Sequence, residues 1–204
     1  MTGNVRAAEE LPVSFFARQA GSVARDLLGK VLVSVVGGRR VAGRIVETEA
    51  YLGRDDPASH AWQMRRNARN GALYGPPGSW YVYLSYGIHW CANLVCNPEG
   101  IGAAVLLRAA EPLEGLEVMR RRRGGQPDRL LCAGPGRLCQ AFGITRRLDS
   151  RAMDRSPVRI LVAPGLPRRA IEVSTRVGIT RAADRPLRFS VRDSPWVSAG
   201  RGRG

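Results

Sequence analysis

Two glutamates and a tyrosine alternate in the stretch RIVETEAY, residues 44–51. If this stretch is a β-strand, its two-residue period places Glu47, Glu49 and Tyr51 on one face. His60 follows in the next loop. Carboxylates with apolar or like-charged neighbours can act as general bases, so this group is a candidate for acid–base chemistry. A solvated polar face is an equally open alternative from this motif alone.

A second candidate is the aromatic stretch SWYVYLSYGIHWCAN, residues 79–93, which holds three of the chain's five tyrosines and two of its four tryptophans. Strand alternation predicts a polar face with Tyr81, Tyr83 and Ser85 and a core face with Val82 and Leu84. Tyr86 lies beside Gly87, where we expect a turn, and a tyrosine at a hairpin tip is well placed to enter a groove. A tyrosine-rich strand alone is more typical of packing. Together with the glutamate strand, His60 and a basic surface, it favours recognition of a flat ring.

The composition points to a polyanionic partner. The 204 residues carry a formal net charge of +15, and Lys30 is the only lysine, so almost all of the positive charge is guanidinium. Such a balance is most often associated with nucleic acid. The arginine-rich codon usage of a high-GC genome is the alternative that needs no partner. No amphipathic apolar helix favours a membrane surface.

Several classes of protein do not fit the sequence. No run approaches the roughly 18 apolar residues of a membrane span, and the first residues do not resemble a secretory signal, so we expect a soluble cytoplasmic protein. Phosphate-binding, dinucleotide-binding, nucleophile-elbow and zinc-protease motifs are absent. The cysteines form no C-x-x-C pair and the chain has two histidines, so we expect no metal and reduced, buried thiols at Cys91, Cys96, Cys132 and Cys139.

The elements that must position these residues are mixed. Apolar periodicity predicts a helix over much of residues 14–28, and Gly37-Gly38 predicts a hairpin between strands at 31–36 and 40–52. The aromatic strand is expected to return after Gly87. Further strands are expected at 102–109 and in the C-terminal third, and helices at 111–123 and from 134. The glycines of GPGR, residues 134–137, either present helix amides to a phosphate or simply begin a helix. The mixture predicts one α+β domain with antiparallel pairing.

Five segments resemble, in matching order, the alkyladenine (3-methyladenine) DNA glycosylase family. They are GRIVETEAYLG…DPASH, YGPPGSWYVYLSYGIHWCAN, GAAVLLRAAEPLEG, CAGPGRLCQAFGI and RPLRFSVRDSPWVS, and the similarity runs from about residue 14 to residue 198. The resemblance implies a single mixed domain, with a curved antiparallel β-sheet, surrounding helices and a protruding β-hairpin. We expect this glycosylase domain at 13–199, between flexible tails at 1–12 and 200–204.

The resemblance also implies roles for individual residues. Glu49 matches the residue that activates the attacking water, and Arg108 matches the arginine that helps to hold it. Tyr86 matches the wedge that fills the gap left in the duplex. The pocket for the flipped-out base is implied at Tyr51, which stacks on the base, His60, which contacts its other side, Tyr83, a third wall, and Asn93, the amide that opposes the amino group of guanine.

One segment departs from the family pattern. Between His60 and Gly75 the family tends to show a glycine-rich loop and a Thr-Pro-Arg-Asn-like run. Here Asn67-Ala68 replaces Thr-Pro, while Arg69-Asn70 remains. The range of lesions accepted therefore depends on how this loop folds.

The sequence and the resemblance together predict a monofunctional enzyme that excises damaged purines from double-stranded DNA in base excision repair. We expect water as the nucleophile, no cofactor, no membrane partner, a monomer, and association with the nucleoid through DNA binding. An amine nucleophile is disfavoured because nothing places Lys30 beside Glu49. A catalytically silent basic nucleic-acid-binding module is the alternative, and a sugar hydrolase with Glu47 and Glu49 as its carboxylate pair is a further one.

Overall fold

The computed structural model describes residues 9–199 of the chain. Its α-helices are α1 (Val13–Phe16), α2 (Ala20–Leu27), α3 (Leu116–Arg122), α4 (Asp128–Leu131) and α5 (Pro135–Phe142). Its strands are β1 (Val31–Ser34), β2 (Val41–Tyr51), β3 (Trp80–Ser85), β4 (His89–Cys96), β5 (Ala103–Glu114), β6 (Val158–Leu161), β7 (Ile171–Ser174) and β8 (Arg188–Val191). Short 3-10 turns occupy many of the connections.

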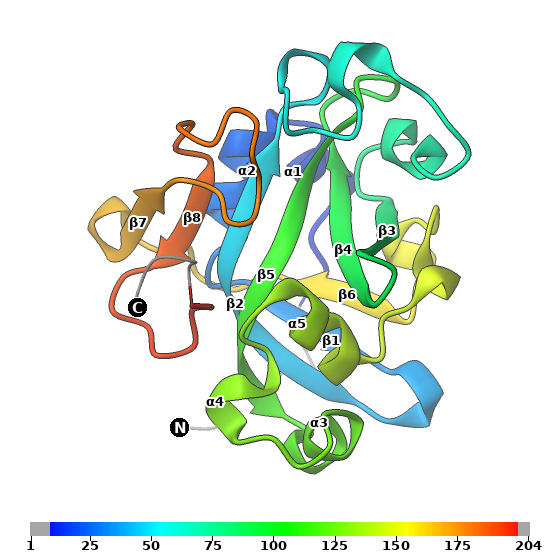
Figure 1. Ribbon diagram of the computed structural model, residues 1–204. Coiled ribbons are helices and arrows are strands. Elements are labelled where there is room, and N and C mark those ends of the chain that lie inside the picture. Colours follow the sequence, from blue (N-terminus) through cyan, green and yellow to red (C-terminus); the bar gives the residue numbers. More distant parts are fainter. Residues whose placement is uncertain (1–8, 200–204) are drawn as a thin grey trace.

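The described strands form one eight-stranded sheet in which every pair is antiparallel. The order is β3-β4-β5-β2-β1-β6, and β8 pairs with both β2 and β7. The first part of β2 pairs with β1 and its later part, Glu47–Glu49, pairs with β8, so two strands share one edge of β2. Helices lie around this sheet, with α1 and α2 near one end of β2 and α3 to α5 toward the other (Figure 1). The predicted α+β class with an antiparallel sheet is confirmed.

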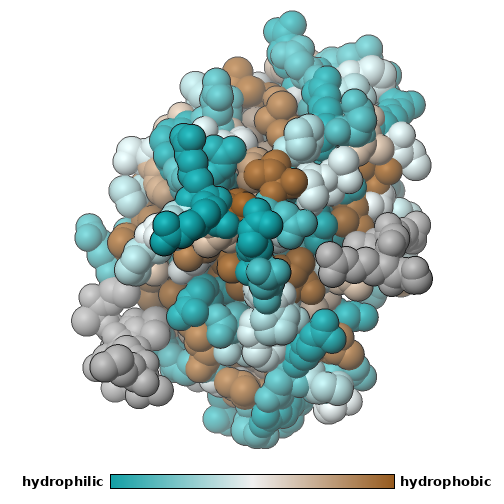
Figure 2. Space-filling view, turned by 90° about the vertical axis from the view of Figure 1, so that its left-hand side faces the viewer, coloured by the Kyte–Doolittle hydropathy of each residue, from teal (hydrophilic) through white to brown (hydrophobic). Residues whose placement is uncertain are grey.

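The surface on the side of β7 and β8 is mainly hydrophilic, with smaller apolar areas among the polar residues (Figure 2). No helix within residues 9–199 is long and apolar enough to cross a membrane. Residues 9–11, part of the predicted N-terminal tail 1–12, lie along β6. The Leu11 amide donates to the Ile160 carbonyl at 2.9 Å, and Glu10 pairs with Arg159. The rest of the two predicted tails, 1–8 and 200–204, lies outside the described residues.

The helical structure predicted over much of residues 14–28 is present, but it is broken into two helices, α1 and α2. Asn97 stabilises the break at residues 17–19. Its backbone amide donates to the carbonyls of Phe16 and Arg18, both at 3.1 Å. The Asn97 side chain accepts the Ala20 amide at the start of α2, also at 3.1 Å. α2 then packs on β2, where the Thr48 hydroxyl donates to the Ala24 carbonyl at 2.8 Å.

Strand β5 is longer than predicted and ends only at Glu114, so a helix from residue 111 is wrong. The pairing with β2 continues through Glu114 and keeps this stretch extended, and Glu111 and Glu114 also form ion pairs with Arg44 and Arg40. Gly115 then turns the chain into α3 with φ of 77°, and a Cβ at this position would lie 2.5 Å from the Arg40 carbonyl oxygen. Only glycine fits this close approach without strain.

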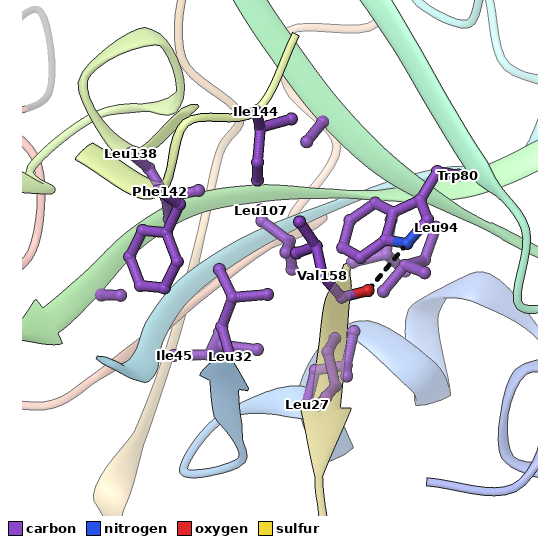
Figure 3. Packing of buried hydrophobic residues seen from close by; sticks show 14 of the residues in the cluster. Leu27, Leu32, Ile45, Trp80, Leu94, Leu107, Leu138, Phe142, Ile144 and Val158 are labelled. Carbon is purple, nitrogen blue, oxygen red and sulfur yellow. Dashed lines mark hydrogen bonds between the residues drawn. The ribbon is translucent and has the colours of Figure 1, made fainter. Parts of the chain in front are cut away.

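The core lies between the sheet and the helices, and the fully buried Trp80 is its largest side chain. Figure 3 shows Trp80 among residues of α2, α5 and several strands, with its indole N–H donating to the Val158 carbonyl at 3.3 Å. Val82 is buried as predicted. Leu84 is 43% exposed, so its predicted place in the core is wrong. The β3–β4 hairpin extends beyond the core at this point and leaves Leu84, Tyr86 and Ile88 in solvent.

Candidate active site

A cavity of about 410 Å³ opens on one face of strands β3, β4 and β5. Strand alternation separates its walls from the core. On β5, Val105 and Leu107 belong to the core, whereas Leu106 and Arg108 line the cavity. The same alternation brings in residues from the neighbouring strands, namely Tyr81, Tyr83 and Ser85 of β3 and Cys91 and Asn93 of β4. The cavity is therefore built on the sheet and not on loops alone.

Cross-strand register places several of the predicted residues in one row. Tyr81 is opposite Asn93, Asn93 is opposite Leu106, and Leu106 is opposite Glu49. On the other side of β2, Glu49 is opposite Arg188 of β8. Residues far apart in sequence thus meet because directly paired strand residues lie close together.

Glu49 is fully buried and is held by three groups around its carboxylate. The Tyr51 hydroxyl donates to Oε2 at 2.9 Å, and the Val177 amide donates to Oε1 at 2.7 Å. Arg108 Nη1 lies 3.2 Å from Oε1. Tyr51, Arg108 and Val177 all line the cavity, so the carboxylate sits directly behind the cavity wall. Burial, together with Glu49, raises the pKa of Tyr51, which keeps its hydroxyl a proton donor.

Glu47 is also fully buried, but its partners are different. Its Oε1 accepts from Arg108 Nε at 2.8 Å, Arg188 Nε at 2.7 Å and the Ser198 hydroxyl at 2.9 Å, and its Oε2 accepts the Ser198 amide at 2.8 Å. Burial alone would raise the pKa of Glu47, but the Arg108 and Arg188 guanidinium groups hold it below its ordinary value. Glu47 is therefore ionised and serves as the counter-ion of Arg108 and Arg188.

Arg108 connects the two glutamates because of an irregularity in the sheet. Glu47 is opposite Ala109 and Thr48 is opposite Leu107, which leaves Arg108 as the extra residue of a bulge on β5. Bulges of this kind re-aim a side chain. Burial opposes the charge of the guanidinium, yet Glu49 and Glu47 beside it raise the pKa of Arg108 above its usual value. Arg108 therefore remains a cation next to Glu49.

Aromatic rings form a second wall of the cavity. The His60 ring packs edge-on against Tyr83, with ring centroids 4.6 Å apart, and Tyr83 stacks on Tyr81 at 5.4 Å. His60 Nδ1 lies 2.7 Å from the Tyr81 hydroxyl. His60 is open to the cavity, but the protein around it lowers its pKa through burial, which favours the neutral ring at pH 7. The amide of Asn93 is nearly buried and donates to the Tyr81 carbonyl at 3.1 Å.

Tyr86 lies at the tip of the β3–β4 hairpin, on the rim of the cavity, and is 84% exposed. Tyr86 and Gly87 have positive φ values of 50° and 72°, and the Ile88 amide donates to the Ser85 carbonyl at 3.1 Å. Two central residues with positive φ are typical of a type I′ hairpin turn. The position is strained for tyrosine. Tyr86 also borders a second hollow of about 630 Å³ that includes Arg69 and Arg146.

The structure adds supporting residues that sequence reasoning missed. Arg176 and Asp56 form a fully buried bidentate ion pair, with N–O distances of 2.5 and 2.8 Å. The Arg176 guanidinium also lies 4.7 Å from the centroid of the Tyr51 ring. Arg188 and Ser198 both belong to the segment RPLRFSVRDSPWVS, whose resemblance to the family was the one signal that pointed to them.

The divergent loop is organised by its asparagines. Asn70 is buried and donates to the carbonyls of His60 and Arg65, at 2.8 and 2.9 Å, and it accepts the Asn67 amide at 2.8 Å. These hydrogen bonds hold the loop against His60, which lies in the wall of the candidate pocket. Pro135, the first residue of α5, also lines the cavity.

No metal-binding arrangement is seen in the described part of the chain, where no three His, Cys, Asp or Glu residues are suitably grouped. The four cysteines are buried and form no disulfide, and Cys91 lies in the cavity wall. Lys30 does not line this cavity, and its Nζ contacts the Ala163 carbonyl.

Comparisons with known proteins agree with this architecture. A family model described as Methylpurine-DNA glycosylase (MPG) matches residues 14–195. Similar proteins include one from Agrobacterium fabrum, 50% identical over 191 residues, with 93% of this chain and 92% of the relative covered. Another, from Nitrosospira multiformis, is 48% identical over 183 residues, with 90% and 91% covered. Both carry the name "Putative 3-methyladenine DNA glycosylase". The chain therefore belongs to the methylpurine-DNA glycosylase family and is a DNA repair enzyme that hydrolyses N-glycosyl bonds.

Proposed function

We propose that this protein is a monofunctional glycosylase that flips a damaged purine of the 3-methyladenine type out of duplex DNA and hydrolyses its glycosidic bond with water. It acts as a monomer through a single domain, residues 13–199. One observation carries the proposal. An aromatic-walled cavity has the buried carboxylate of Glu49 directly behind it and the exposed ring of Tyr86 at its rim.

Base recognition follows from the walls of the cavity. Rotating a base out of the stack costs a few kcal/mol, and the Tyr86 ring offsets part of this by filling the gap. The flipped base lies between Tyr51 and His60, with Tyr83 as a third wall. Alkylation at N3 or N7 makes a purine cationic, and contact with a tyrosine face then stabilises it by about 0.5–2 kcal/mol. Asn93 opposes the amino group of guanine.

Glu49 is the general base of the reaction. It takes a proton from water, whose oxygen bonds to C1′ of the sugar while the bond from C1′ to the purine nitrogen breaks and its electron pair leaves with the base. Arg108 holds the water, and the Glu49 carboxylate balances the positive charge that develops on the sugar. Because Glu49 is fully buried, the Tyr51 hydroxyl that covers Oε2 shifts when water enters.

The position of Lys30 supports water as the nucleophile. Glycosylases that also cut the backbone attack the sugar with an amine. Lys30 is the only lysine of the chain, and it is not among the residues that line the cavity. Its Nζ is engaged by the Ala163 carbonyl.

The two alternatives are less well supported. A silent nucleic-acid-binding module has no use for a carboxylate buried behind an aromatic cavity. A sugar hydrolase would need Glu47 as the partner of Glu49, but Arg108, Arg188 and Ser198 already occupy the Glu47 carboxylate.

The test is release of free base from alkylated duplex DNA, with undamaged duplex and a simple glycoside as controls. We expect free purine and an uncut abasic strand from the alkylated duplex alone. Binding without release would support the silent module, and cleavage of the glycoside would support the sugar hydrolase. Cutting of the strand by a borohydride-trappable intermediate would contradict the use of water.

A further inference from the structure

The Trp62 ring lies against two guanidinium groups. Arg65 Cζ is 5.1 Å from the ring centroid and Arg181 Cζ is 4.9 Å from it. Arg65 belongs to the same turn as Trp62, since the Arg65 amide donates to the Trp62 carbonyl at 3.2 Å. Arg181 comes from a remote part of the chain. The contact between Trp62 and Arg181 therefore joins two separate segments, and neither residue lines the cavity.

In each of these segments, the residues that line the cavity come two or more positions before the contact residue in the sequence. The first, which we call the His60 loop (residues 52–66), contributes Ser59 and His60, and the Trp62 amide donates to the Ser59 carbonyl at 3.1 Å. The second, which we call the 176–182 segment, contributes Val177 to Ile179. Trp62 and Arg181 thus meet where the two walls come together.

The 176–182 segment also supplies one of the three groups that hold the Glu49 carboxylate. Its Val177 amide donates to Glu49 Oε1 at 2.7 Å. At the start of the segment, Arg176 is anchored to Asp56 of the His60 loop, and its Nη2 also reaches the Ala182 carbonyl at 3.4 Å. The segment is closed by this bond, so its far end at Arg181 is coupled to the Val177 amide.

We propose that Trp62 and Arg181 are positioning residues for catalysis. Their contact holds the 176–182 segment against the His60 loop and thereby keeps the Val177 amide on the Glu49 carboxylate. The expected effect on base excision rests on the proposed function, whereas the effect on Val177 does not.

The chain provides a matched control in Arg65. Arg65→Ala and Arg181→Ala each remove one exposed guanidinium from the same ring, and so they lose the same charge toward DNA. Only Arg181→Ala removes a contact between the two segments, and it leaves the buried Arg176–Asp56 pair in place. Trp62→Ala removes the same contact from the other side, and Trp62→Phe retains an aromatic face.

Two measurements test the proposal in these variants, namely hydrogen exchange of the Val177 amide and single-turnover excision from alkylated duplex DNA. Exposed cation–π contacts are weak, so we expect Arg181→Ala and Trp62→Ala to lower both the protection of Val177 and the excision rate by about two- to fivefold. Arg65→Ala and Trp62→Phe should stay close to wild type. The double variant Trp62→Ala/Arg181→Ala should be no worse than either single variant, because both remove the same contact.

Three results would overturn the proposal. Equal effects of Arg65→Ala and Arg181→Ala would show that only charge matters. Unchanged protection of Val177, with slower excision that saturating protein restores, would make Arg181 a ligand for a DNA phosphate. Additive effects in the double variant would show that the two residues act separately. If the wild-type protein releases no base but Val177 loses protection only in Arg181→Ala and Trp62→Ala, the proposed function fails and the positioning claim stands.

Discussion

Glu47 and Glu49 are the same residue type on the same face of β2, yet their partners differ. Glu47 accepts from two guanidinium groups and twice from Ser198, whereas Glu49 accepts from the neutral Tyr51 hydroxyl and Val177 amide and shares Arg108. Their alternation predicted a shared face, and that prediction is confirmed. Which of them is a counter-ion became visible only when remote residues such as Ser198 were placed around them.

Acid should destabilise the domain through its buried ion pairs. Burial raises but Arg176 lowers the pKa of Asp56, with a net shift below its ordinary value, and Glu47 is shifted the same way. A depressed pKa means that the stabilisation is complete above the unfolded value, about 4, and is lost as the pH falls through the lower folded value. Thermal unfolding of wild type and Asp56→Asn between pH 7 and pH 2 measures this. Asp56→Asn should be less stable at pH 7 and lose less on acidification, and parallel curves would contradict the assignment.

Asn93 should control discrimination between purines. Its side chain is in the cavity wall and is fixed by the bond from Nδ2 to the Tyr81 carbonyl. Asn93→Ala or Asn93→Ser removes the clash and the unpaired amide that oppose guanine's amino group, which should raise guanine-type excision relative to adenine-type by about tenfold. Single-turnover rates on both lesions in one duplex context measure this ratio. An equal slowing of both lesions would mean that Asn93 acts in flipping instead.

At the scale of elements, period-two alternation predicted the polar and core faces of β3 correctly up to the point where the hairpin leaves the core. Leu84 breaks the pattern because nothing covers this part of the hairpin. The break between α1 and α2 and the bulge at Arg108 were not predictable from local pattern. Each depends on residues far away in sequence. The break is stabilised by Asn97, and the bulge arises from the way β5 pairs with β2.

The hairpin tip should act on every lesion alike. Tyr86→Ala removes the ring that fills the duplex, at a cost of about 1–3 kcal/mol, so excision should slow by a similar factor for all substrates and least for mispaired bases. Tyr86→Gly is the control, because glycine relieves the backbone strain at φ of 50° while it also removes the ring. The two variants should be equally slow in single-turnover assays. A near-normal Tyr86→Gly, or a change in lesion preference, would show that the wedge role is wrong.

For the whole molecule, the sequence predicted the single α+β sheet domain and the family, since its motifs span most of the chain. The charge of +15 was more ambiguous, because genomic bias and DNA binding give the same composition. The structure shows exposed arginines such as Arg66 and Arg69 in the loop that follows His60, and Arg69 lines the hollow beside Tyr86. Their position in this loop favours a role with phosphates.

Binding to undamaged duplex DNA should therefore weaken steeply with salt. Guanidinium contacts to phosphate release counterions, so several contacts should give a loss of about 10³-fold or more between 50 and 200 mM salt. The slope of the logarithm of the binding constant against the logarithm of the salt concentration should fall in Arg69→Ala by about the share of one phosphate contact. Titration at a series of salt concentrations measures the slope, and a flat response would mean that the charge is genomic bias.

The most direct test of the central claim compares Glu49→Gln with Glu47→Gln in single-turnover excision from alkylated duplex DNA, with binding and thermal unfolding measured in parallel. Glutamine keeps the size and shape of glutamate but cannot take a proton. We predict that Glu49→Gln abolishes base release and largely preserves binding to the damaged duplex. Glu47→Gln should affect the chemical step less, and it should lower stability by about 3 kcal/mol because buried Arg108 and Arg188 lose their shared counter-ion. Near-normal base release by Glu49→Gln, or a stronger loss in Glu47→Gln, would contradict the account.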